Sequence, residues 1–463
     1  MADELTVVVL AAGKGTRMKS RVPKLLHPVC GSAILSWVLR AVQELEPAQV
    51  IVVVNDRNGD ISRVASSVGC EVVVQSNPLG TGHALQQARD IVRSDWLLIV
   101  PGDLPLLEGA TLAPLVEMCV RRSDDEPQDL TVVTMRPDKP GAYGRIIRDD
   151  AGNLCRIVEA HDASCGERAI GEVNSGVYVL RAGAFLWETL ESLGADNAQQ
   201  EHYITDLVSS YRQRGQTVSA VAAEDSSSFL GINSRADLAR ACGHMYRRTA
   251  DRWMDAGVTI QSPSTTFIEP SVVLEPDTTI LSGTHLLGMT SVGTASVIGP
   301  DVWAEDTRIE AGCEVRYSVI EQATIRSGSR VGPYAHLRPG ADVGPNVRIG
   351  NFVEVKATRV GEGAKVGHLT YLGDADIGQR VNIGAGTITC NFDGKNKHRT
   401  IIGDDAFIGS NASLIAPVDI GKGSLVAGGS TITDDVPEGA RAFGRARQVI
   451  KPAVPDLEEE NTS

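Results

Sequence analysis

Short apolar runs alternate with amphipathic segments of helical length along the first half of the chain. The runs with the length of β-strands lie at 5–12, 49–55 and 95–103, and the segments with helical spacing at 33–45 and 83–92. Strands joined by helical crossovers form a mainly parallel sheet with both faces covered. We therefore expect an α/β domain over residues 1–233. Ligands of such sheets bind at the carboxyl ends of the strands, so the turns after residues 10, 54 and 100 are candidate sites.

The next segment, residues 234–257, predicts a single amphipathic helix. Ser234 can cap its first turn and Gly257 can end it. Its apolar stripe consists of Leu238, Cys242, Met245 and Trp253. Beyond this segment helix signals vanish while proline and glycine multiply, so we interpret the helix as an arm that links two domains of different architecture.

Residues 258–450 repeat an aliphatic residue at every sixth position, commonly followed by glycine. The regularly spaced residues are Ile268, Leu274, Ile280, Leu286, Val292 and Ile298, then Val319, Ile325, Val331, Leu337, Val343, Ile349 and Val355, then Val360, Val366, Leu372, Ile377 and Ile383, and finally Ile402, Ile408, Leu414, Ile420, Val426 and Ile432. This period predicts a parallel β-helix of hexapeptides, each strand turning one aliphatic side chain toward a central column. The alternative is an irregular β-rich domain, which would not keep one register over several blocks.

Two segments fall outside this repeat. Residues 389–400 interrupt it, and insertions in solenoids loop out and often serve binding. Residues 451–463 are acidic and rich in proline, and we expect them to form a disordered tail.

Composition narrows the range of partners. The net charge of −14 and the pI near 5.2 argue against general affinity for nucleic acid or an anionic membrane. The 8 cysteines form no CxxC pair, so neither a zinc ribbon nor a disulfide framework is indicated. No apolar run approaches the ~18 residues of a membrane span, and the N-terminus is unlike a signal peptide. We expect a cytoplasmic protein that binds neither nucleic acid nor membrane.

The first strand leads into LAAGKGTRM, a glycine-rich turn with basic neighbours at Lys14, Lys19 and Arg21. It has neither the GxxxxGK[ST] of a Walker loop nor the third glycine and later acid of a dinucleotide fingerprint. Gly13 and Gly15 permit close approach of a ligand to the backbone. Arg17 and Lys24 are placed to reach phosphates. The alternative interpretation is a tight strand-to-helix turn with solvated cations.

Further motifs along the same half support a ligand-binding interpretation. The turn, followed by PKLLHPVCG, resembles the motif of sugar-1-phosphate nucleotidyltransferases, which have a Rossmann-like domain. QSNPLGTGHAL is similar to the base-recognition segment of that family, and PGDLPLL to its metal-binding strand end. AYGRI, IVEAHDA, EVNSGVY and GINSR follow in the order of the family.

This resemblance implies a site for UTP or a UDP-sugar. The implied contacts are Leu10, Ala11, Ala12, Gly13, Lys24, Gln75, Gly80, Thr81, Pro101, Gly102, Asp103, Gly144, Glu159, Asn174 and Asn233. Asp103 and Asn233 would hold Mg²⁺, a hard cation that takes oxygen ligands. Arg17 and Lys24 would stabilise the transition state and the leaving group.

Together with the β-helix, these motifs make residues 5–450 resemble the bacterial bifunctional family of N-acetylglucosamine-1-phosphate uridyltransferase / glucosamine-1-phosphate N-acetyltransferase. The resemblance implies a left-handed β-helix, a homotrimer with sites between neighbouring prisms, and a role in supplying precursors for peptidoglycan, lipopolysaccharide or other cell-wall polymers. It also implies four small-molecule substrates: UTP, acetyl-CoA, glucosamine 1-phosphate and N-acetylglucosamine 1-phosphate.

One histidine in the repeats suits the acetyl transfer that the resemblance implies. His368 lies two residues beyond the inward Val366, where a solvated side chain is one interpretation. An ammonium must lose a proton before it attacks a thioester, and a neutral imidazole can accept that proton, so His368 is the candidate general base. By resemblance, the amino-sugar phosphate contacts are Arg338, Lys356, Tyr371 and Asn382, and the acetyl-CoA contacts are Ala385, Asn391, Phe392, Ser410, Gly428 and Arg445. Arg338 and Lys356 have an alternative interpretation as exposed coil charges.

Three positions depart from the family pattern. Pro101 stands where an aromatic residue is common, His161 where a lysine is usual, and Phe392 where tyrosine often follows the asparagine. His161 puts a phosphate or sugar contact in doubt, and Phe392 removes a hydroxyl. Two competing functions share the same motifs: a single-activity nucleotidyltransferase with a non-catalytic β-helix, and a regulatory subunit without catalysis. The presence of Lys24, Asp103 and Asn233 argues against the second.

Overall fold

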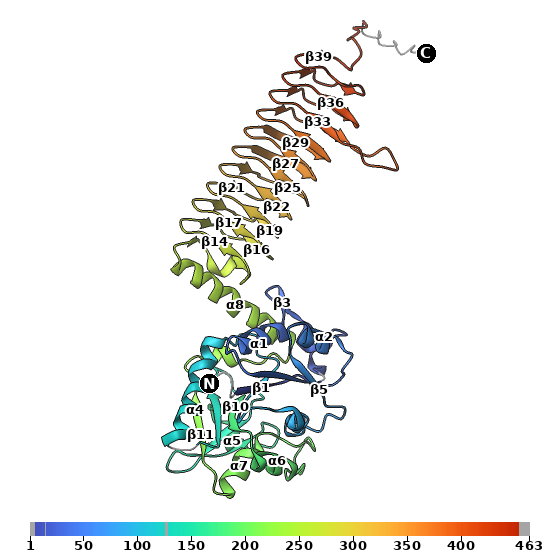
Figure 1. The fold of residues 1–463 in the computed structure, drawn as a ribbon. Helices are drawn as coiled ribbons and strands as arrows, with labels where there is room; N and C mark the ends of the chain where they lie inside the picture. Colours follow the sequence, from blue (N-terminus) through green and yellow to red (C-terminus); the bar gives the residue numbers. More distant parts are fainter. Residues whose placement is uncertain (1–4, 14, 126–127, 453–463) are drawn as a thin grey trace, which may run out of the picture. The chain divides into compact units, whose positions relative to one another are not determined.

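The computed structural model describes residues 5–13, 15–125 and 128–452 and divides the chain into two compact units, residues 1–245 and 246–463 (Figure 1). Lys14 and the predicted tail beyond residue 452 lie outside the described residues. The boundary between the units falls within helix α8 (Arg235–Asp255), the helix predicted as an arm.

The first unit is built on one mixed β-sheet. Its strands are β1 (Leu5–Leu10), β4 (Gln49–Val54), β5 (Glu71–Val74), β6 (Trp96–Pro101), β7 (Leu130–Met135), β8 (Arg145–Arg148), β9 (Leu154–Val158), β10 (Val173–Arg181) and β11 (Val218–Ala222), and a separate hairpin pairs β2 (Pro28–Val29) with β3 (Ser32–Ala33). The order is β11-β7-β10-β6-β1-β4-β5; β1 pairs parallel with β4 and β6, and β10 runs antiparallel between β6 and β7. The predicted parallel strands therefore end together at one edge of the sheet.

Helices cover both faces of this sheet. The helical segments are η2 (Thr16–Met18), η3 (Lys24–Leu26), α1 (Ile34–Gln43), α2 (Asp60–Ser67), α3 (Thr81–Gln86), η4 (Arg89–Ile91), α4 (Gly109–Asp125), α5 (Cys165–Arg168), α6 (Ala184–Glu191), α7 (Asp206–Gln213) and η5 (Ser226–Phe229). Val7, Val8 and Val9 of β1 are all fully buried although successive side chains point to opposite faces, which requires cover on both. The helix predicted over 83–92 is wrong in its extent, because the chain tightens after α3 into the 3₁₀ turn η4, where the Ala88 carbonyl accepts from the amides of both Ile91 and Val92.

The second unit is a left-handed parallel β-helix of hexapeptide coils (Figure 1). One of its sheets contains β14 (Val273–Leu274), β17 (Ser291–Val292), β20 (Arg308–Ile309), β23 (Thr324–Ile325), β26 (Asp342–Val343), β28 (Arg359–Val360), β30 (Ala375–Ile377), β33 (Thr400–Ile402) and β36 (Val418–Ile420). The other contains β12 (Thr259–Ile260), β13 (Phe267–Ile268), β15 (Thr279–Ile280), β16 (His285–Leu287), β18 (Val297–Ile298), β19 (Trp303–Glu305), β21 (Glu314–Val315), β22 (Val319–Glu321), β24 (Arg330–Val331), β25 (His336–Leu337), β27 (Arg348–Lys356), β29 (Lys365–Gly373), β31 (Asn382–Ile383), β32 (Ile388–Cys390), β34 (Phe407–Ile408), β35 (Ser413–Ile415), β37 (Leu425–Val426), β38 (Thr431–Ile432) and β39 (Arg441–Ala442). A short 3₁₀ turn, η6 (Pro263–Thr265), follows the first strand.

Successive coils stack in register around the predicted aliphatic column. Phe267 pairs with His285 and His285 with Trp303, a step of 18 residues that corresponds to three hexapeptides. Ile268 and Leu286, one position further along, are fully buried. The α/β fold predicted for the first unit and the β-helix predicted from the period of six for the second unit are therefore confirmed.

The prediction of the aliphatic column is wrong for one residue, Val319. Val319 is 40% exposed, whereas its neighbour Ile320 is fully buried and pairs with Ala304. The coil before it is short, because Trp303 pairs with Val319 over only 16 residues. A shift of one residue turns a strand side chain to the other face, so Ile320 takes the inward position.

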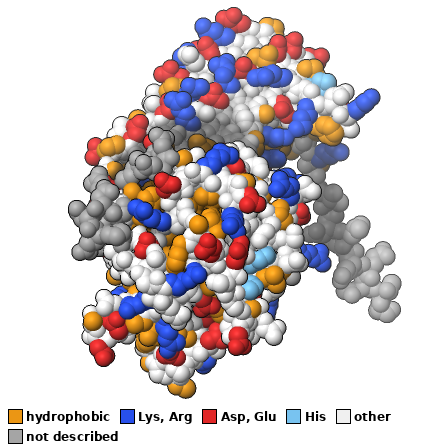
Figure 2. Space-filling view, turned by 60° about the horizontal axis from the view of Figure 1, so that its bottom comes forward, with side chains coloured by type: hydrophobic (Ala, Val, Ile, Leu, Met, Phe, Trp, Pro, Cys, Tyr) orange, Lys and Arg blue, Asp and Glu red, His pale blue; other side chains and the backbone are white. Residues whose placement is uncertain are grey.

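Charged side chains of both signs lie on the molecular surface. On the face shown in Figure 2, acidic and basic side chains are intermixed and do not gather by sign. Within residues 5–13, 15–125 and 128–452, every helix is too short or too polar to serve as a membrane span.

Candidate active sites

Three segments distant in sequence converge at the carboxyl edge of the first sheet. The Lys24 ammonium lies 2.6 Å from Asp103 Oδ2, directly after β6, and 3.4 Å from Asn233 Oδ1, just before α8. Arg17 donates through Nη2 to the same Asn233 oxygen at 2.8 Å. The side chains of Lys24 and Asp103 are only 13% and 19% exposed. The two predicted cations and the two predicted metal ligands thus form one cluster.

The glycine-rich turn supports this cluster through close backbone packing. Gly15 has a φ of +60°, and a Cβ there would lie 2.4 Å from Lys24 Cβ. Gly13 differs, because a Cβ there would meet nothing within 4 Å. Gly102 donates its amide to the Leu10 carbonyl at 2.9 Å, which joins the end of β1 to the end of β6. Gly15 therefore positions Lys24, whereas Gly13 borders open space where a ligand can approach.

These two glycines give a testable contrast. Gly15→Ala should lower the melting temperature together with the uridylyl transfer that the sequence resemblance implies, because a side chain at this φ and distance forces Lys24 to move, at a cost of about 1–3 kcal/mol. Gly13→Ala should leave the melting temperature within about 1 °C of wild type and raise the KM for UTP, since its methyl group meets only the ligand. Thermal unfolding and pyrophosphate-release assays on both variants check this. Equal destabilisation by the two substitutions would contradict the assignment.

A second group of predicted residues lies where α3 begins. Gln75 follows β5 and is 4% exposed, and its Nε2 donates to the Gly80 carbonyl at 2.9 Å. Gly80 has a φ of +107°, and a Cβ there would lie 2.5 Å from the His202 carbonyl oxygen. Thr81 accepts through Oγ1 from the Ile204 amide at 3.0 Å. The segment predicted to recognise the base is therefore held against residues 202–204.

A third group lies around β8, β9 and β10. Asn174 accepts a hydrogen bond from the Gly176 amide and donates to the Tyr178 hydroxyl at 2.6 Å. The backbone amide of Asn174 donates to the Gly144 carbonyl at 2.9 Å. A Cβ on Gly144 would lie 3.5 Å from Glu159 Oε1. Burial raises the pKa of Glu159, whose carboxylate accepts from Thr205 Oγ1 at 3.1 Å.

Contacts link the three groups into one rim. Thr205, which bonds Glu159, follows Ile204, which bonds Thr81. Pro101 packs against Gly176, which has a φ of +84°. A Cβ on Gly176 would lie 2.7 Å from Pro101 Cγ, so this position excludes a side chain. Hydrogen bonds and packing therefore join the three groups of predicted residues into one rim near the strand ends. His161, the departure from the family pattern, is exposed beside this rim.

The cluster has the donor set of a magnesium site. A cation, the Lys24 ammonium, already lies between Asp103 Oδ2 and Asn233 Oδ1, so both oxygens face one cationic position. Within the part of the chain that the structure describes, no three His, Cys, Asp or Glu side chains converge as a complete metal centre. Mg²⁺ is commonly held by one or two protein oxygens plus substrate phosphates, which is the arrangement this pair can supply.

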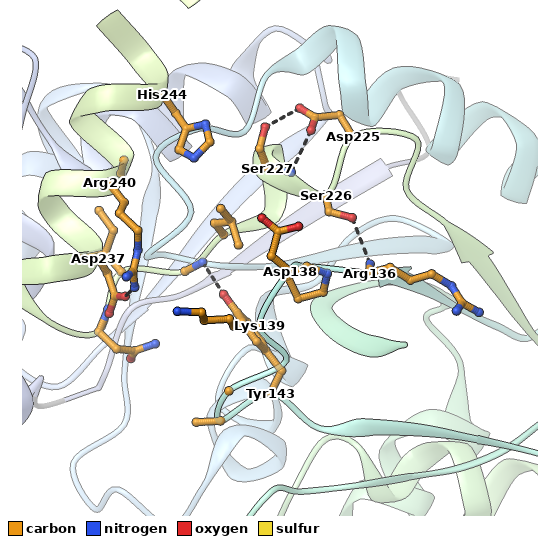
Figure 3. A pocket seen from close by; sticks show the side chains of 18 of the residues that line it. Arg136, Asp138, Lys139, Tyr143, Asp225, Ser226, Ser227, Asp237, Arg240 and His244 are labelled. Carbon is orange, nitrogen blue, oxygen red and sulfur yellow. Dashed lines mark hydrogen bonds and ion pairs between the residues drawn. The ribbon is translucent and has the colours of Figure 1, made fainter. Parts of the chain in front are cut away.

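A cavity of about 690 Å³ lies beside this cluster and shares Arg17 and Asn233 with it. Figure 3 shows its wall, formed by the loop that carries Lys139 and Tyr143 and by the side chains of α8. The Tyr143 hydroxyl accepts from the Gly231 amide at 2.9 Å, and burial, with nearby Asp103, raises its pKa. Sequence reasoning missed this role of Tyr143, although the motif AYGRI contains it.

In the second unit, three predicted phosphate contacts gather on one face of the β-helix. Arg338 donates to Glu354 at 2.7 Å, and Glu354 pairs with Tyr371 on the next coil. Lys356 ends β27, and the nearby Lys397 ammonium lowers its pKa. Arg338 and Lys356 therefore interact with neighbouring side chains on this face.

The loop at 389–400 contributes to the same face, as predicted for an insertion (Figure 1). Asn391 is 8% exposed and donates to Asp374 and, at 3.5 Å, to the Tyr371 hydroxyl. Phe392 is 60% exposed, and its backbone pairs with that of Lys397 in an isolated antiparallel β-bridge. Asp393 accepts from the Lys395 and Asn396 amides and from His398, and these bonds lower its pKa to about 2.

The remaining predicted residues of this unit are more dispersed. Ala385, Ser410 and Gly428 stack at one corner of successive coils, since Ala385 accepts from Asn411 and Ser410 accepts from Gly429. Asn382 pairs with Lys365, at the other end of β29 from Tyr371. His368 is exposed in β29, and Arg445 is exposed beyond β39. A single chain therefore does not bring Asn382, His368 and Arg445 into the Tyr371 group.

Family models match both units. Residues 7–173 match a MobA-like NTP transferase domain, residues 322–357 a bacterial transferase hexapeptide (six repeats), and residues 399–434 a hexapeptide repeat of succinyl-transferase. The protein is therefore a transferase that combines a nucleotidyltransferase domain with a hexapeptide-repeat domain.

Curated relatives define the family more narrowly. The chain is 45% identical over 453 residues to the bifunctional protein GlmU of Pelobacter propionicus, covering 96% of this chain and 97% of that protein. It is 44% identical over 444 residues to the bifunctional protein GlmU of Carboxydothermus hydrogenoformans, covering 96% and 98%. The corresponding values for the bifunctional protein GlmU of Caldanaerobacter subterraneus are 45% over 452 residues, covering 97% of each. The chain belongs to the GlmU family of bifunctional proteins, which confirms the resemblance indicated by its motifs.

Proposed function

We propose that the chain catalyses two steps of UDP-N-acetylglucosamine synthesis. The second unit acetylates glucosamine 1-phosphate with acetyl-CoA, and the first unit transfers UMP from UTP to the N-acetylglucosamine 1-phosphate formed. The observation that carries the proposal is the convergence of Arg17, Lys24, Asp103 and Asn233 at the carboxyl edge of a nucleotidyltransferase sheet. UTP and acetyl-CoA are cytoplasmic metabolites, so we place both reactions in the cytoplasm, where the product supplies cell-wall polymers.

In the uridylyl step, a phosphate oxygen of the sugar attacks the α-phosphorus of UTP in line, and pyrophosphate leaves. Bound Mg²⁺ would neutralise phosphate charge, with Asp103 and Asn233 as its protein ligands. Lys24 and Arg17 are close enough to transfer their hydrogen bonds from Asn233 to phosphate oxygens. Glu159 and Asn174, on the rim, are the candidates to hold the sugar hydroxyl and amide groups. The protein thus contributes position and charge, and no covalent intermediate.

In the acetyl step, His368 accepts a proton from the ammonium of glucosamine 1-phosphate. The amine then attacks the thioester carbonyl and the C–S bond breaks. The coenzyme A thiolate takes the second proton that the nitrogen loses as the amide forms and leaves as the thiol, and His368 releases its proton to solvent. Arg338, Lys356 and Tyr371 would hold the sugar phosphate, which fixes the amine relative to the thioester. Asn391 and Phe392, with the corner residues Ala385, Ser410 and Gly428, would hold acetyl-CoA, as would Arg445.

A homotrimer would complete this second site, because Asn382 and His368 lie apart from the Tyr371 group in one chain. A column of exposed apolar side chains supports such an assembly: Tyr317, Tyr334, Phe352 and Leu369 stack along one edge. The ring centroids are 5.7 Å apart between the first pair and 5.6 Å apart between the second. His368 immediately precedes Leu369, so the proposed base lies at this edge.

Polar substitution in the column tests the assembly. The double change Tyr334→Asp and Phe352→Asp should convert the trimer to monomer and lower acetyl transfer more than tenfold, while uridylyl transfer stays within about twofold. Light scattering gives the mass and the two assays give the activities. Met289→Asp is the matched control, because Met289 is 76% exposed but lies outside the column. A trimeric double variant would contradict the proposed interface.

The overall proposal is tested with purified protein. UTP, Mg²⁺ and a panel of sugar phosphates, with and without acetyl-CoA, should give pyrophosphate only with N-acetylglucosamine 1-phosphate, or with glucosamine 1-phosphate plus acetyl-CoA. Pyrophosphate release without any thiol release would favour the alternative, a single-activity enzyme with a non-catalytic β-helix.

A further inference from the structure

The proposed base-recognition segment contains a contact between two of its own side chains, Gln75 and His83, and no role has been given to the second of them. Gln75 Nε2 lies 2.9 Å from the Gly80 carbonyl oxygen and 2.9 Å from Nδ1 of His83, in the first turns of α3. Gln75 itself is 4% exposed and therefore has little freedom to take another rotamer. His83 thus touches the residue proposed to face the base.

The Gly80 carbonyl and His83 Nδ1 together hold the Gln75 amide in one orientation. A carbonyl oxygen only accepts, so the NH₂ group of Gln75 must face it. The second hydrogen of that NH₂ group then points to His83 Nδ1, which must be the accepting nitrogen of a neutral ring. Both amide hydrogens are used within the protein, so the group that Gln75 can present to a base is its oxygen, an acceptor.

The surroundings of His83 favour the neutral ring that this arrangement needs. Burial, and then the nearby His202 imidazole, lower the pKa of His83 below its usual value. The ring proton then resides on Nε2, which lies 3.3 Å from the Gln87 amide nitrogen. The same Gln87 nitrogen donates to the His83 carbonyl at 3.1 Å, so its contact with the ring is secondary, and the shorter contact of 2.9 Å with Gln75 indicates that Nδ1 is the accepting nitrogen.

An acceptor at this position distinguishes the two pyrimidines. Uracil carries a hydrogen on N3, whereas the N3 of cytosine is an acceptor without a hydrogen. Two hydrogen bonds from the Gln75 NH₂ group fix the carboxamide with its oxygen free, and that oxygen accepts from the N3–H of uracil but repels the N3 lone pair of cytosine. A site built to bond one pattern discriminates strongly against the other. If the Gln75 amide could turn over, its NH₂ group would suit cytosine.

We propose that His83 is a positioning residue that sets the choice of UTP over CTP by holding the Gln75 carboxamide with its oxygen toward the base. The inference rests on the proposed uridylyl transfer and goes beyond it by naming the residue that selects the base. His83 touches Gln75 and not the substrate, so it acts through the amide.

Two substitutions separate the lost acceptor from the lost ring. His83→Leu keeps most of the side-chain volume but removes Nδ1, and should lower the ratio of kcat/KM for UTP to that for CTP at least tenfold. His83→Asn places a carboxamide oxygen near the position of Nδ1, and should keep the ratio within about threefold of wild type. Steady-state pyrophosphate release with each nucleotide gives the ratios, and thermal unfolding checks that both variants fold.

The possible outcomes distinguish failure of the proposed role of His83 from failure of the proposed uridylyl transfer. A folded His83→Leu protein with the wild-type ratio overturns the role of His83, as does an equal loss in His83→Leu and His83→Asn. A wild-type protein that releases no pyrophosphate from UTP overturns the proposed uridylyl transfer, and the inference with it.

Discussion

Replacing His368 by alanine is expected to abolish acetyl transfer and leave uridylyl transfer intact. The imidazole is the proposed acceptor of the substrate proton, and removal of a general base lowers rates by about 10²–10⁴-fold. His368 is exposed in β29, so its loss should create no cavity and little change in stability. The measurements are thiol release from acetyl-CoA with glucosamine 1-phosphate, and pyrophosphate release from UTP with N-acetylglucosamine 1-phosphate, on the same preparation.

A rescue experiment distinguishes proton transfer from a merely structural role. Added imidazole should restore part of the acetyl transfer of His368→Ala, because a small base can enter the space left by the side chain. Simultaneous loss of both activities in His368→Ala would be incompatible with two separate sites. Failure of imidazole to restore any activity would remove the proton-acceptor role.

The second large effect is expected on uridylyl transfer, at the cluster of Lys24, Asp103 and Asn233. Asp103→Asn should lower uridylyl transfer by about 10²–10³-fold, the size found when one preorganised electrostatic contact is removed. The substitution replaces the carboxylate that faces Lys24 at 2.6 Å and weakens the proposed metal position. The Mg²⁺ concentration for half-maximal rate should rise, while acetyl transfer continues at the wild-type rate.

Controls for this prediction follow from the same chemistry. Asp149→Asn changes an acid in the β8–β9 turn, where Asp149 bonds Asn153 and Arg212, and should leave both activities unchanged. Addition of EDTA to wild-type protein should stop pyrophosphate release and spare thiol release. Unchanged turnover of UTP by Asp103→Asn would eliminate the metal assignment.

The architecture was largely predictable, because the sequence shows alternating strand and helix segments in its first half and a six-residue period in its second. The spacing of six from Ile268 to Ile298 specified the coil, since all these side chains point to one column. Val319 failed because the 16-residue coil before it changes the register, and two adjacent aliphatic residues, Val319 and Ile320, both suit a strand. Periodicity cannot decide between such neighbours without the coil lengths.

The site was predictable in its members but not in its contacts. Motifs named Lys24, Asp103 and Asn233, yet their hydrogen bonds depend on how segments some 80 to 210 residues apart meet in space. The sequence could not separate the roles of Gly13 and Gly15, because only φ and the distance to Lys24 distinguish them. His83 and Tyr143 were likewise overlooked although both lie in motifs, because their hydrogen bonds to Gln75 and Gly231 depend on the folded positions of the side chains.

The ion pair between Lys24 and Asp103 has a consequence for the resting protein. Arg17 belongs to the same cluster, so its three charged side chains, two cations and one carboxylate, carry an excess of one positive charge. That excess would attract a polyanion such as a triphosphate before any specific contact forms. A divalent cation held by Asp103 and Asn233 would replace the ammonium beside the carboxylate, and Lys24 would then be available to an incoming phosphate.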